Sequence, residues 1–219
     1  MTKKDLSNLL AKYVPKNVSI IDRYKIIYRP YITPFVDLLN LIPAQSKIFD
    51  IGCGNGALLN LIYQTKNPLK IGGVEISKKL VDNATELLNQ TVKNKVNNIA
   101  EINIKQYDGI NLPNLADYDF VLLVDVIHHI PKSQLKQFFI VLKQNMKPGA
   151  TLILKDIDAG KPILVLFNKL HDFIVSQEIG NEISQKNAEN ILIQSEFKIK
   201  SASYLRMLWY PHYTILATA

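Results

Sequence analysis

The sequence is poor in cysteine, tryptophan and arginine: its 219 residues include one cysteine, one tryptophan and three arginines. A lone cysteine cannot form an internal disulfide, and Cys53 lies between two glycines with no Cys/His cluster nearby. Neither a disulfide framework nor a metal site is therefore predicted. This cysteine usage is typical of a protein of the reducing cytoplasm.

Long hydrophobic runs are also lacking. The most apolar stretch, "PILVLF" at residues 162–167, is far shorter than the ~20 residues that cross a bilayer. Lys3, Lys4 and Asp5 are followed by only a short apolar patch, which does not match a signal peptide. We expect a cytoplasmic protein without a membrane span.

The scarcity of arginine argues against nucleic acid as a partner. The formal net charge is +7, but the lysines are scattered along the chain. Arg23, Arg29 and Arg206 are too few for an interface of bidentate phosphate or guanine contacts. A generally basic, solvated surface is the better interpretation, and nucleic acid is an unlikely ligand.

The rest of the sequence indicates one folded α/β domain. Hydrophobic residues make up 47% and charged residues 21%, and the length suits a single core. Short β-rich runs alternate with helical ones, which predicts a parallel sheet covered by helices. The predicted strands, each expected to be buried on both faces, are 47–51, 70–76, 101–107, 119–125 and 150–156. The predicted helices between them are 56–64, 77–92 and 131–145, with Ser77 and Ser133 near their starts.

The two ends of the chain differ from this middle. Residues 1–46 are predicted to form a cap of short helices, interrupted by Pro30, Pro34 and Pro43. Residues 157–195 are predicted to form a helical acceptor-side segment, with helices at 162–178 and 184–195. Two β runs at 196–219 predict a terminal hairpin. The whole, residues 1–219, is predicted to be a single domain: a Rossmann-like, doubly wound sheet of seven strands, mostly parallel, with a C-terminal antiparallel hairpin.

The stretch "FDIGCGNG" at 49–56 is the strongest local motif. A strand followed by three closely spaced glycines predicts a tight turn that approaches a ligand. Glu75 follows at the distance of an acid that accepts ribose hydroxyls, as in NAD-dependent dehydrogenases. Asp50, however, would repel a pyrophosphate and suits a ligand that carries an ammonium and a sulfonium group. The loop contains no lysine, which excludes a P-loop.

Five motifs in order resemble those of class I S-adenosylmethionine (SAM)-dependent methyltransferases. They are "IFDIGCGNG", "GVEIS", "QYDG", "DFVLLVDVIHHI" and "LKQNMKPGATLILKD", and they cover about 47–156. The resemblance implies SAM as cofactor. It implies that the amino-acid part of SAM lies against the loop residues Asp50, Gly52, Gly54 and Gly56.

The same resemblance implies the other cofactor contacts. Glu75 would bind both ribose hydroxyls and Ile76 would pack on the adenine. Asp108, with Gly109 beside it, would meet the adenine amino group. Asp125 and Val126 would lie near the methionine and sulfonium. Each acid also has a structural alternative: a helix cap for Asp50, a surface ion pair for Glu75 and a turn for Asp108.

Three residues are candidates for acceptor chemistry. His128 follows the fourth predicted strand, Asp156 ends the fifth, and His171 lies on the helix expected to cover this edge. A base is needed only if the acceptor must lose a proton. For both histidines a purely structural role is the alternative.

A narrower resemblance concerns the acceptor. "RYKIIYRPYITPF", "VDVIHHIP", "LKDI", "NKLHDFIVSQE" and "LWYPHYTI" are similar to a bacterial methyltransferase group of aryl polyene and fatty-acid-like biosynthesis. It implies that the methyl acceptor is a small aromatic or acyl molecule. This acceptor is either free or bound to an acyl carrier protein. The sequence departs from the group at "EIGNEIS". The alternatives are an RNA or protein methyltransferase, an NAD-dependent dehydrogenase and a non-catalytic cofactor-binding subunit; the lack of an "NPPY"-type motif argues against methylation of nucleic-acid base amines.

Overall fold

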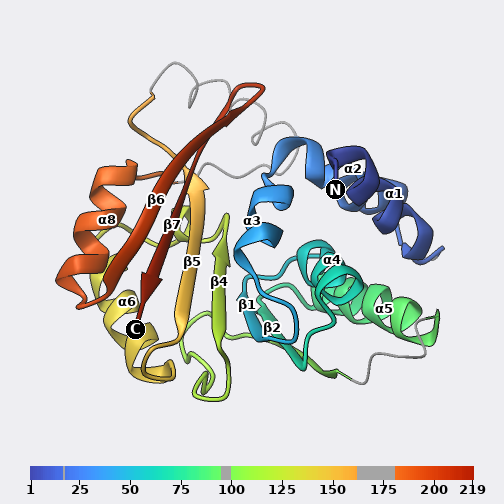
Figure 1. The fold of residues 1–219 in the computed structure, drawn as a ribbon, viewed down its shortest axis with the longest axis horizontal. Coiled ribbons are helices and arrows are strands. Elements are labelled where there is room, and N and C mark those ends of the chain that lie inside the picture. The colour runs from blue at the N-terminus through green and yellow to red at the C-terminus, as the bar shows by residue number, and fades with distance from the viewer. Residues whose placement is uncertain (17, 95–99, 162–180) are drawn as a thin grey trace. The chain divides into compact units, whose positions relative to one another are not determined.

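The computed structural model describes residues 1–16, 18–94, 100–161 and 181–219. Its seven strands form one mixed sheet in the order β3-β2-β1-β4-β5-β7-β6 (Figure 1). The strands are β1 (Lys47–Ile51), β2 (Lys70–Glu75), β3 (Glu101–Gln106), β4 (Phe120–Val124), β5 (Thr151–Ile157), β6 (Lys198–Met207) and β7 (Tyr210–Thr218). β1 and β3 pair with β2 in parallel, whereas β7 is antiparallel to both β5 and β6. The predicted fold class is thus confirmed.

The first five strands, β1 to β5, begin and end within one residue of their predicted bounds, but β3 is not buried as expected. Its residues are half-buried or exposed, in contrast to the buried middles of β1, β2 and β4. β3 is the edge strand of the sheet and has a neighbour on one side only. An edge position explains why its polar side chains Glu101, Lys105 and Gln106 are tolerated.

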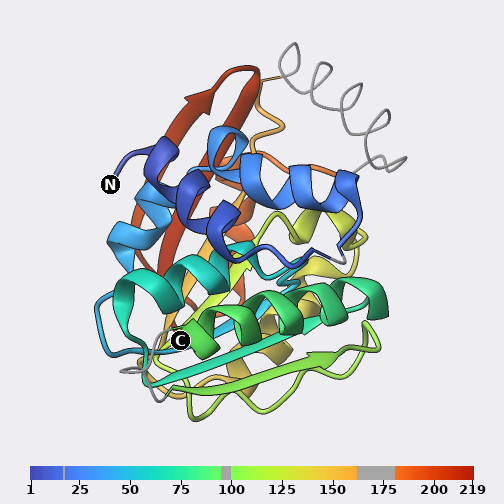
Figure 2. The same cartoon turned by 90° about the vertical axis from the view of Figure 1, so that its right-hand side faces the viewer.

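The chain divides into two compact units: residues 1–112 with 118–120, and residues 113–117 with 121–219. The single domain over residues 1–219 stays a prediction. The helices of the first unit are α1 (Lys3–Tyr13), α2 (Ile20–Ile32), α3 (Phe35–Leu41), α4 (Ala57–Lys66) and α5 (Lys78–Asn94). Figure 2 shows α4 and α5 side by side.

Local capping explains where several of these helices begin. Thr2 and Asp5 form a reciprocal capping box at α1, and the Ser19 side chain accepts a hydrogen bond from the Asp22 N–H at α2. At α5 the Ser77 hydroxyl accepts from the Leu80 N–H at 3.4 Å, as its position in the sequence predicted.

The predicted break at Pro30 is wrong, because α2 continues through it to Ile32. Pro30 lies in the last turn and on the buried face of the helix. Since proline lacks one N–H, a position near the end of the helix limits the damage to a single lost backbone hydrogen bond. Pro34, in contrast, occupies the N-cap of α3 and does separate two helices.

The second unit contains a 3₁₀ turn, η1 (Ile127–His129), and the helices α6 (Leu135–Asn145) and α8 (Gln185–Gln194). The prediction for Ser133 is wrong: Gln134 is the N-cap of α6 and makes no side-chain capping bond. Here burial of Leu135 and Phe139 fixes the helix. Ser184 caps α8 by accepting from the Asn187 N–H. The helix expected at 162–178 lies outside the described residues.

No helix in the described ranges is both long and apolar enough to cross a membrane. The interior of the first unit is instead built from short elements in close contact. Gly72 of β2 lies against the rings of Phe49 and Tyr118, which meet edge to face at 4.9 Å between centroids. A Cβ at Gly72 would stand 2.4 Å from Phe49 Cδ2 and 2.5 Å from the Tyr118 hydroxyl. Glycine is therefore required here by close approach.

We predict that Gly72→Ala lowers the free energy of unfolding by about 1–3 kcal/mol, because a methyl group must displace two packed rings. Urea denaturation followed by circular dichroism measures the loss. Gly149→Ala is the comparison: its Cβ would meet nothing within 4 Å, although its φ of +81° is unfavourable for alanine. A smaller loss for Gly72→Ala than for Gly149→Ala would contradict the crowding argument.

Candidate functional site

The glycine loop connects β1 to α4 in the first unit. Gly52, Gly54 and Gly56 have φ values of +76°, +54° and +74°. The N–H groups of Gly52 and Cys53 donate to the Val74 carbonyl of β2 at 2.8 and 3.1 Å. A Cβ at Gly56 would lie 2.8 Å from Ala84 Cβ of α5. The loop thus forms the predicted turn, in which the positive φ angles favour glycine and the close contact with Ala84 requires glycine at position 56.

Glu75 is the last residue of β2, and backbone donors hold its carboxylate. Oε2 accepts from the Gly54 N–H at 3.1 Å, and Oε1 accepts from the Ser77 N–H at 3.0 Å. The side chain therefore links the glycine loop to the start of α5. Each carboxylate oxygen can accept further hydrogen bonds, such as those from a ribose diol.

Asp50 is buried within β1 and is only 2% exposed. Burial, with the nearby charge of Glu75 as the second cause, raises the pKa of Asp50 well above its usual range. Among the described residues its Oδ1 has no hydrogen-bond partner. A buried carboxyl oxygen without a partner costs about 1–3 kcal/mol, so it is an atom for which a ligand would supply the missing partner. The alternative role as a helix cap does not apply, since Asp50 lies in a strand.

Cys53 sits in the same loop, where its surroundings make the thiol inert. Burial, followed by the charges of Asp50 and Glu75, raises the pKa of Cys53 far above its usual range. The thiol therefore stays protonated and is a poor nucleophile. Cys53 is therefore not a candidate nucleophile.

Asp108 and Gly109 form the turn after β3. Asp108 Oδ1 accepts from the N–H groups of Ile110 and Asn111, each at 2.8 Å, and Oδ2 accepts from Asn111 Nδ2 at 2.7 Å. These bonds, led by the one from Asn111 N–H, lower the pKa of Asp108. The turn role is thus realised. Gly109 lies next to Ile76, because a Cβ there would be 3.6 Å from Ile76 Cδ1.

Asp125 and Val126 follow β4, and both belong to the second unit. Asp125 has a φ of +59°, which is unusual for a residue other than glycine. Its N–H donates to the Lys155 carbonyl at 2.9 Å, and its carboxylate pairs with Lys155 Nζ. This pairing holds the carboxylate in place.

Sequence reasoning missed Lys155. Its side chain is completely buried in β5, where the run "ATLILKD" was expected to be apolar on both faces. The signal was nevertheless present, since lysine is almost never fully buried unless it is paired. A lysine inside an apolar strand therefore predicts a buried anion, which is Asp125.

The second unit brings two of the three predicted catalytic residues together. His128, in η1, has its Nδ1 at 2.7 Å from Asp156 Oδ1, and its backbone N–H donates to Asp156 Oδ2 at 3.3 Å. The Ile157 N–H also donates to Oδ1, at 2.7 Å. Asp156 is 1% exposed. The carboxylate thus contacts both the imidazole and the backbone N–H of His128, while His171 lies outside the described residues.

The protonation of His128 follows from this geometry. Burial favours the neutral imidazole, but the charge and hydrogen bond of Asp156 outweigh it and raise the pKa of His128 to about 9. The ring therefore carries a positive charge at neutral pH. It can donate a hydrogen bond but cannot accept a proton.

Tyr213 of β7 lies beside Asp156 in the sheet register, and its hydroxyl is buried. Burial, followed by the charges of Asp156, Asp158 and Asp125, raises the pKa of Tyr213 well above its usual range. Its phenol is therefore neutral and able to donate a hydrogen bond.

No cluster of three or more His, Cys, Asp or Glu side chains suited to a metal ion occurs in the described ranges.

A parallel α/β sheet with a glycine loop after its first strand and an acid after its second defines a class of nucleoside-cofactor-binding proteins. The comparison with protein families narrows the class: residues 49–152 match the family described as methyltransferase domain. The chain has the fold of class I SAM-dependent methyltransferases. Among curated proteins, none is significantly similar in sequence.

Solved structures with the same fold include a SAM-dependent methyltransferase from Methanosarcina mazei, 18% identical with a TM-score of 0.62, which covers 83% of this chain and 96% of its own. Magnesium protoporphyrin IX methyltransferase from Synechocystis with bound SAH is 18% identical, with a TM-score of 0.67 and coverage of 98% and 93%. An O-methyltransferase family 2 protein from Planctomyces limnophilus in complex with apigenin is 14% identical, with a TM-score of 0.66 and coverage of 96% and 65%.

We predict that the His128 ring titrates near pH 9, and that in Asp156→Asn its pKa falls below this value because burial is then opposed by a weaker partner. Two-dimensional NMR of the imidazole signals measures both midpoints. His128→Gln identifies the signal and His129→Gln serves as the matched control. A midpoint near the ordinary 6.5 in the unmodified protein would contradict the predicted pairing.

The same shift sets a dependence of stability on pH. Since the folded-state pKa of His128 is raised, its stabilisation is complete below about pH 6.5 and is lost as the pH rises to about 9. Its contribution is about 3 kcal/mol at most. Urea denaturation across this window should show a steeper loss for the unmodified protein than for His128→Gln.

Proposed function

We propose that the chain is an enzyme that binds SAM at the glycine loop of the first unit and transfers its methyl group to a small-molecule or acyl-type acceptor. The observation that carries the cofactor assignment is the partnerless Oδ1 of buried Asp50 beside the carboxylate of Glu75. Two neighbouring carboxylates favour a cationic ligand. SAM brings an ammonium group and a sulfonium, and it carries no phosphate.

The same charges disfavour the dehydrogenase alternative. A dinucleotide would bring its negatively charged pyrophosphate to the loop beside Asp50 and Glu75. Charges of the same sign repel each other. Asp50 lies inside β1, so its carboxylate cannot swing away with a mobile loop. NAD is therefore a poor fit to these residues.

The adenosine contacts follow from the resemblance and from the observed positions. Glu75 would accept hydrogen bonds from the ribose hydroxyls, while the loop and Ser77 N–H groups keep its carboxylate oriented. Ile76, exposed next to Gly109, would pack on the adenine. Asp108 would contact the adenine amino group without leaving its turn, since a carboxylate can accept several hydrogen bonds.

We predict that Glu75→Gln weakens the binding of S-adenosylhomocysteine by about tenfold, corresponding to ~1.4 kcal/mol, because the amide has one acceptor oxygen instead of two. Isothermal titration calorimetry measures this affinity. Glu101→Gln is the matched control, because Glu101 pairs with Lys70 at 3.0 Å on the edge strand. Unchanged binding by a folded Glu75→Gln would refute the ribose role, and tight NAD binding would refute the cofactor.

The acceptor assignment rests on the second unit. When bound, SAM supplies an electrophilic methyl group on its sulfonium. The protein has to align the acceptor and exclude water. The charged His128, oriented by Asp156, would donate a hydrogen bond to an oxygen atom of the methyl acceptor, such as a carbonyl oxygen. Asp125 and Val126 stay candidates for contact with the cofactor. His171 is proposed as a further acceptor residue on sequence grounds.

Structural neighbours support the acceptor class. Their names include a magnesium protoporphyrin IX methyltransferase and an O-methyltransferase in complex with apigenin, which are enzymes of small molecules. A carrier-bound aromatic or acyl group is the narrower form of the proposal, and the net charge of +7 suits an acidic carrier. RNA or protein is the alternative acceptor.

The free thiol of Cys53 agrees with the proposed cytoplasmic location.

We predict that His128→Gln lowers kcat by about 100-fold while the affinity for S-adenosylhomocysteine is preserved, because a charged donor to the acceptor is lost. Release of S-adenosylhomocysteine is measured with a panel of aromatic acids, phenols and acyl thioesters. The rate in the unmodified protein should fall as the pH rises through about 9, where the imidazolium loses its proton.

Two outcomes separate the alternatives. A rate that rises through the same pH range would mean that the neutral imidazole acts as a base. Binding of S-adenosylhomocysteine without turnover on any acceptor, with RNA and protein included in the panel, would favour a non-catalytic cofactor-binding subunit. The His129 ring lies 4.1 Å from the His128 ring, so His129→Gln is the control for a change in packing.

A further inference from the structure

α2 has apolar side chains on two opposite sides, and only one side is used by the fold. Asp22, Ile26 and Pro30 face inward. At about 100° per residue, the opposite side of the helix carries a second set of apolar and aromatic residues. This tyrosine face consists of Ile20, Ile21, Tyr24, Tyr28 and Tyr31.

The tyrosine face is strongly exposed. Ile20 is 87% exposed, Ile21 68% and Tyr24 62%, and Tyr28 and Tyr31 are also exposed. The rings of Tyr24 and Tyr28 stack with centroids 4.3 Å apart, and those of Tyr28 and Tyr31 lie 6.0 Å apart. The side chains thus form a continuous apolar stripe along one helix. Contiguous exposed stripes of this kind mark interaction surfaces.

The helix cannot easily turn this face inward. Asp22 is buried and pairs with Lys79 of α5 at 2.6 Å, and its Oδ2 also accepts from the Ser19 hydroxyl at 2.7 Å. Ile26 is 1% exposed. These contacts fix the rotation of α2 about its own axis and keep the tyrosine face outward.

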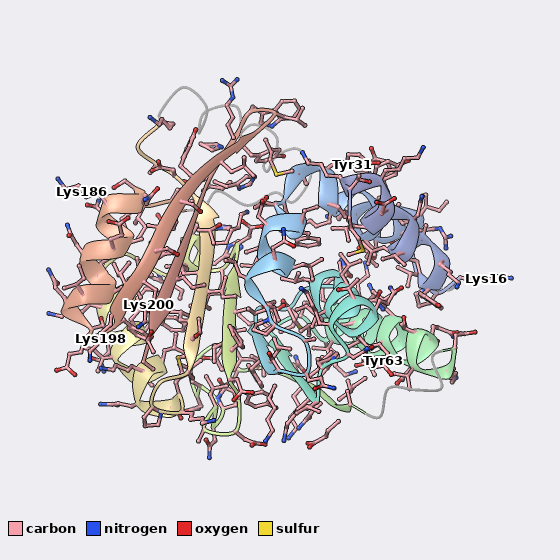
Figure 3. All side chains as sticks on the ribbon, viewed as in Figure 1. Lys16, Tyr31, Tyr63, Lys186, Lys198 and Lys200 are labelled. Carbon is pink, nitrogen blue, oxygen red and sulfur yellow. The ribbon has the colours of Figure 1, made fainter. Side chains whose placement is uncertain are left out.

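Positive charge is concentrated in the same part of the chain. Residues 1–33 contain seven lysines and arginines but only two aspartates, so they carry +5 of the net +7. Asp22 is buried, and Asp5 caps α1 through the Thr2 N–H at 2.7 Å. Lys3, Lys4, Lys12 and Lys16 are exposed. Figure 3 labels Lys16, whose side chain points outward beyond α1, and Tyr31 on α2.

We propose that the tyrosine face docks on the surface of an anionic lipid bilayer. An amphipathic helix that lies in the plane of a membrane has an apolar stripe bordered by cations, and tyrosine is favoured at the level of the headgroups. Lysine side chains can extend to the lipid phosphates while their methylene groups stay on apolar surface.

The proposal is independent of the cofactor assignment, since its residues are not among those proposed to bind SAM. The full chain is sedimented with vesicles of phosphatidylglycerol and phosphatidylcholine, and with vesicles of phosphatidylcholine alone. We expect binding to the anionic vesicles only, and weaker binding as the salt concentration rises. Binding to neither kind of vesicle would overturn the proposal.

Variants assign the surface. The triple substitution Ile21→Ser, Tyr24→Ser and Tyr28→Ser should weaken vesicle binding by about tenfold or more, because the inserted apolar area is lost. Lys12→Gln with Lys16→Gln should weaken it as well. Ile110→Ser is the matched control, since Ile110 is 79% exposed elsewhere in the same unit and should not matter.

Circular dichroism confirms that each variant is folded, and S-adenosylhomocysteine affinity should be equal in all of them. Equal loss of vesicle binding in Ile110→Ser would overturn the assignment to the tyrosine face. So would binding of a purified acyl carrier protein to the tyrosine face with no binding to vesicles, because the partner would then be an acidic protein.

Discussion

Asp50 is buried in a strand and shares its surroundings with a second carboxylate, Glu75. Glu75 is satisfied by the N–H groups of Gly54 and Ser77, whereas Asp50 Oδ1 has no partner among the described residues. Burial and repulsion together raise the pKa of Asp50, so the carboxyl group is held in an unfavourable state by the fold. The glycine loop that follows this acid has positive φ angles and packs on Ala84 through Gly56.

The second unit handles buried charge in the opposite way. Lys155 is paired with Asp125, and His128 with Asp156, so each of these two buried cations has a carboxylate in contact. Pairing of this kind offsets the desolvation of the two charges. It does fix geometry: Asp125 is held at a positive φ, and the imidazole of His128 is held in one orientation. The two units therefore differ in what they offer a ligand, an unsatisfied acceptor in one and an oriented, protonated donor in the other.

Much of this could be predicted from the sequence, because buried parallel strands and glycine turns have strong local signals. The strands β1 to β5 and the loop residues Gly52, Gly54 and Gly56 are where the pattern placed them. Position in the sheet was not accessible in the same way. β3 was expected to be buried, and only its place at the edge explains its exposure. The lysine in an apolar strand indicates a buried anion, but its identity could not be predicted from a local pattern, because Asp125 is thirty positions away.

The tyrosine face shows a related limit of sequence patterns. Hydrophobic periodicity gives the direction of a single apolar stripe, but α2 has two, and the stretch "RYKIIYRPY" mixes both with cations. Which stripe turns inward is decided by tertiary contacts, here the burial of Ile26 and the ion pair between Asp22 and Lys79. Over the whole sequence the lysines are scattered, and no charged surface could be predicted from their positions alone. Once α2 is fixed in rotation, an exposed aromatic stripe lies in the same short segment that carries five of the seven net charges.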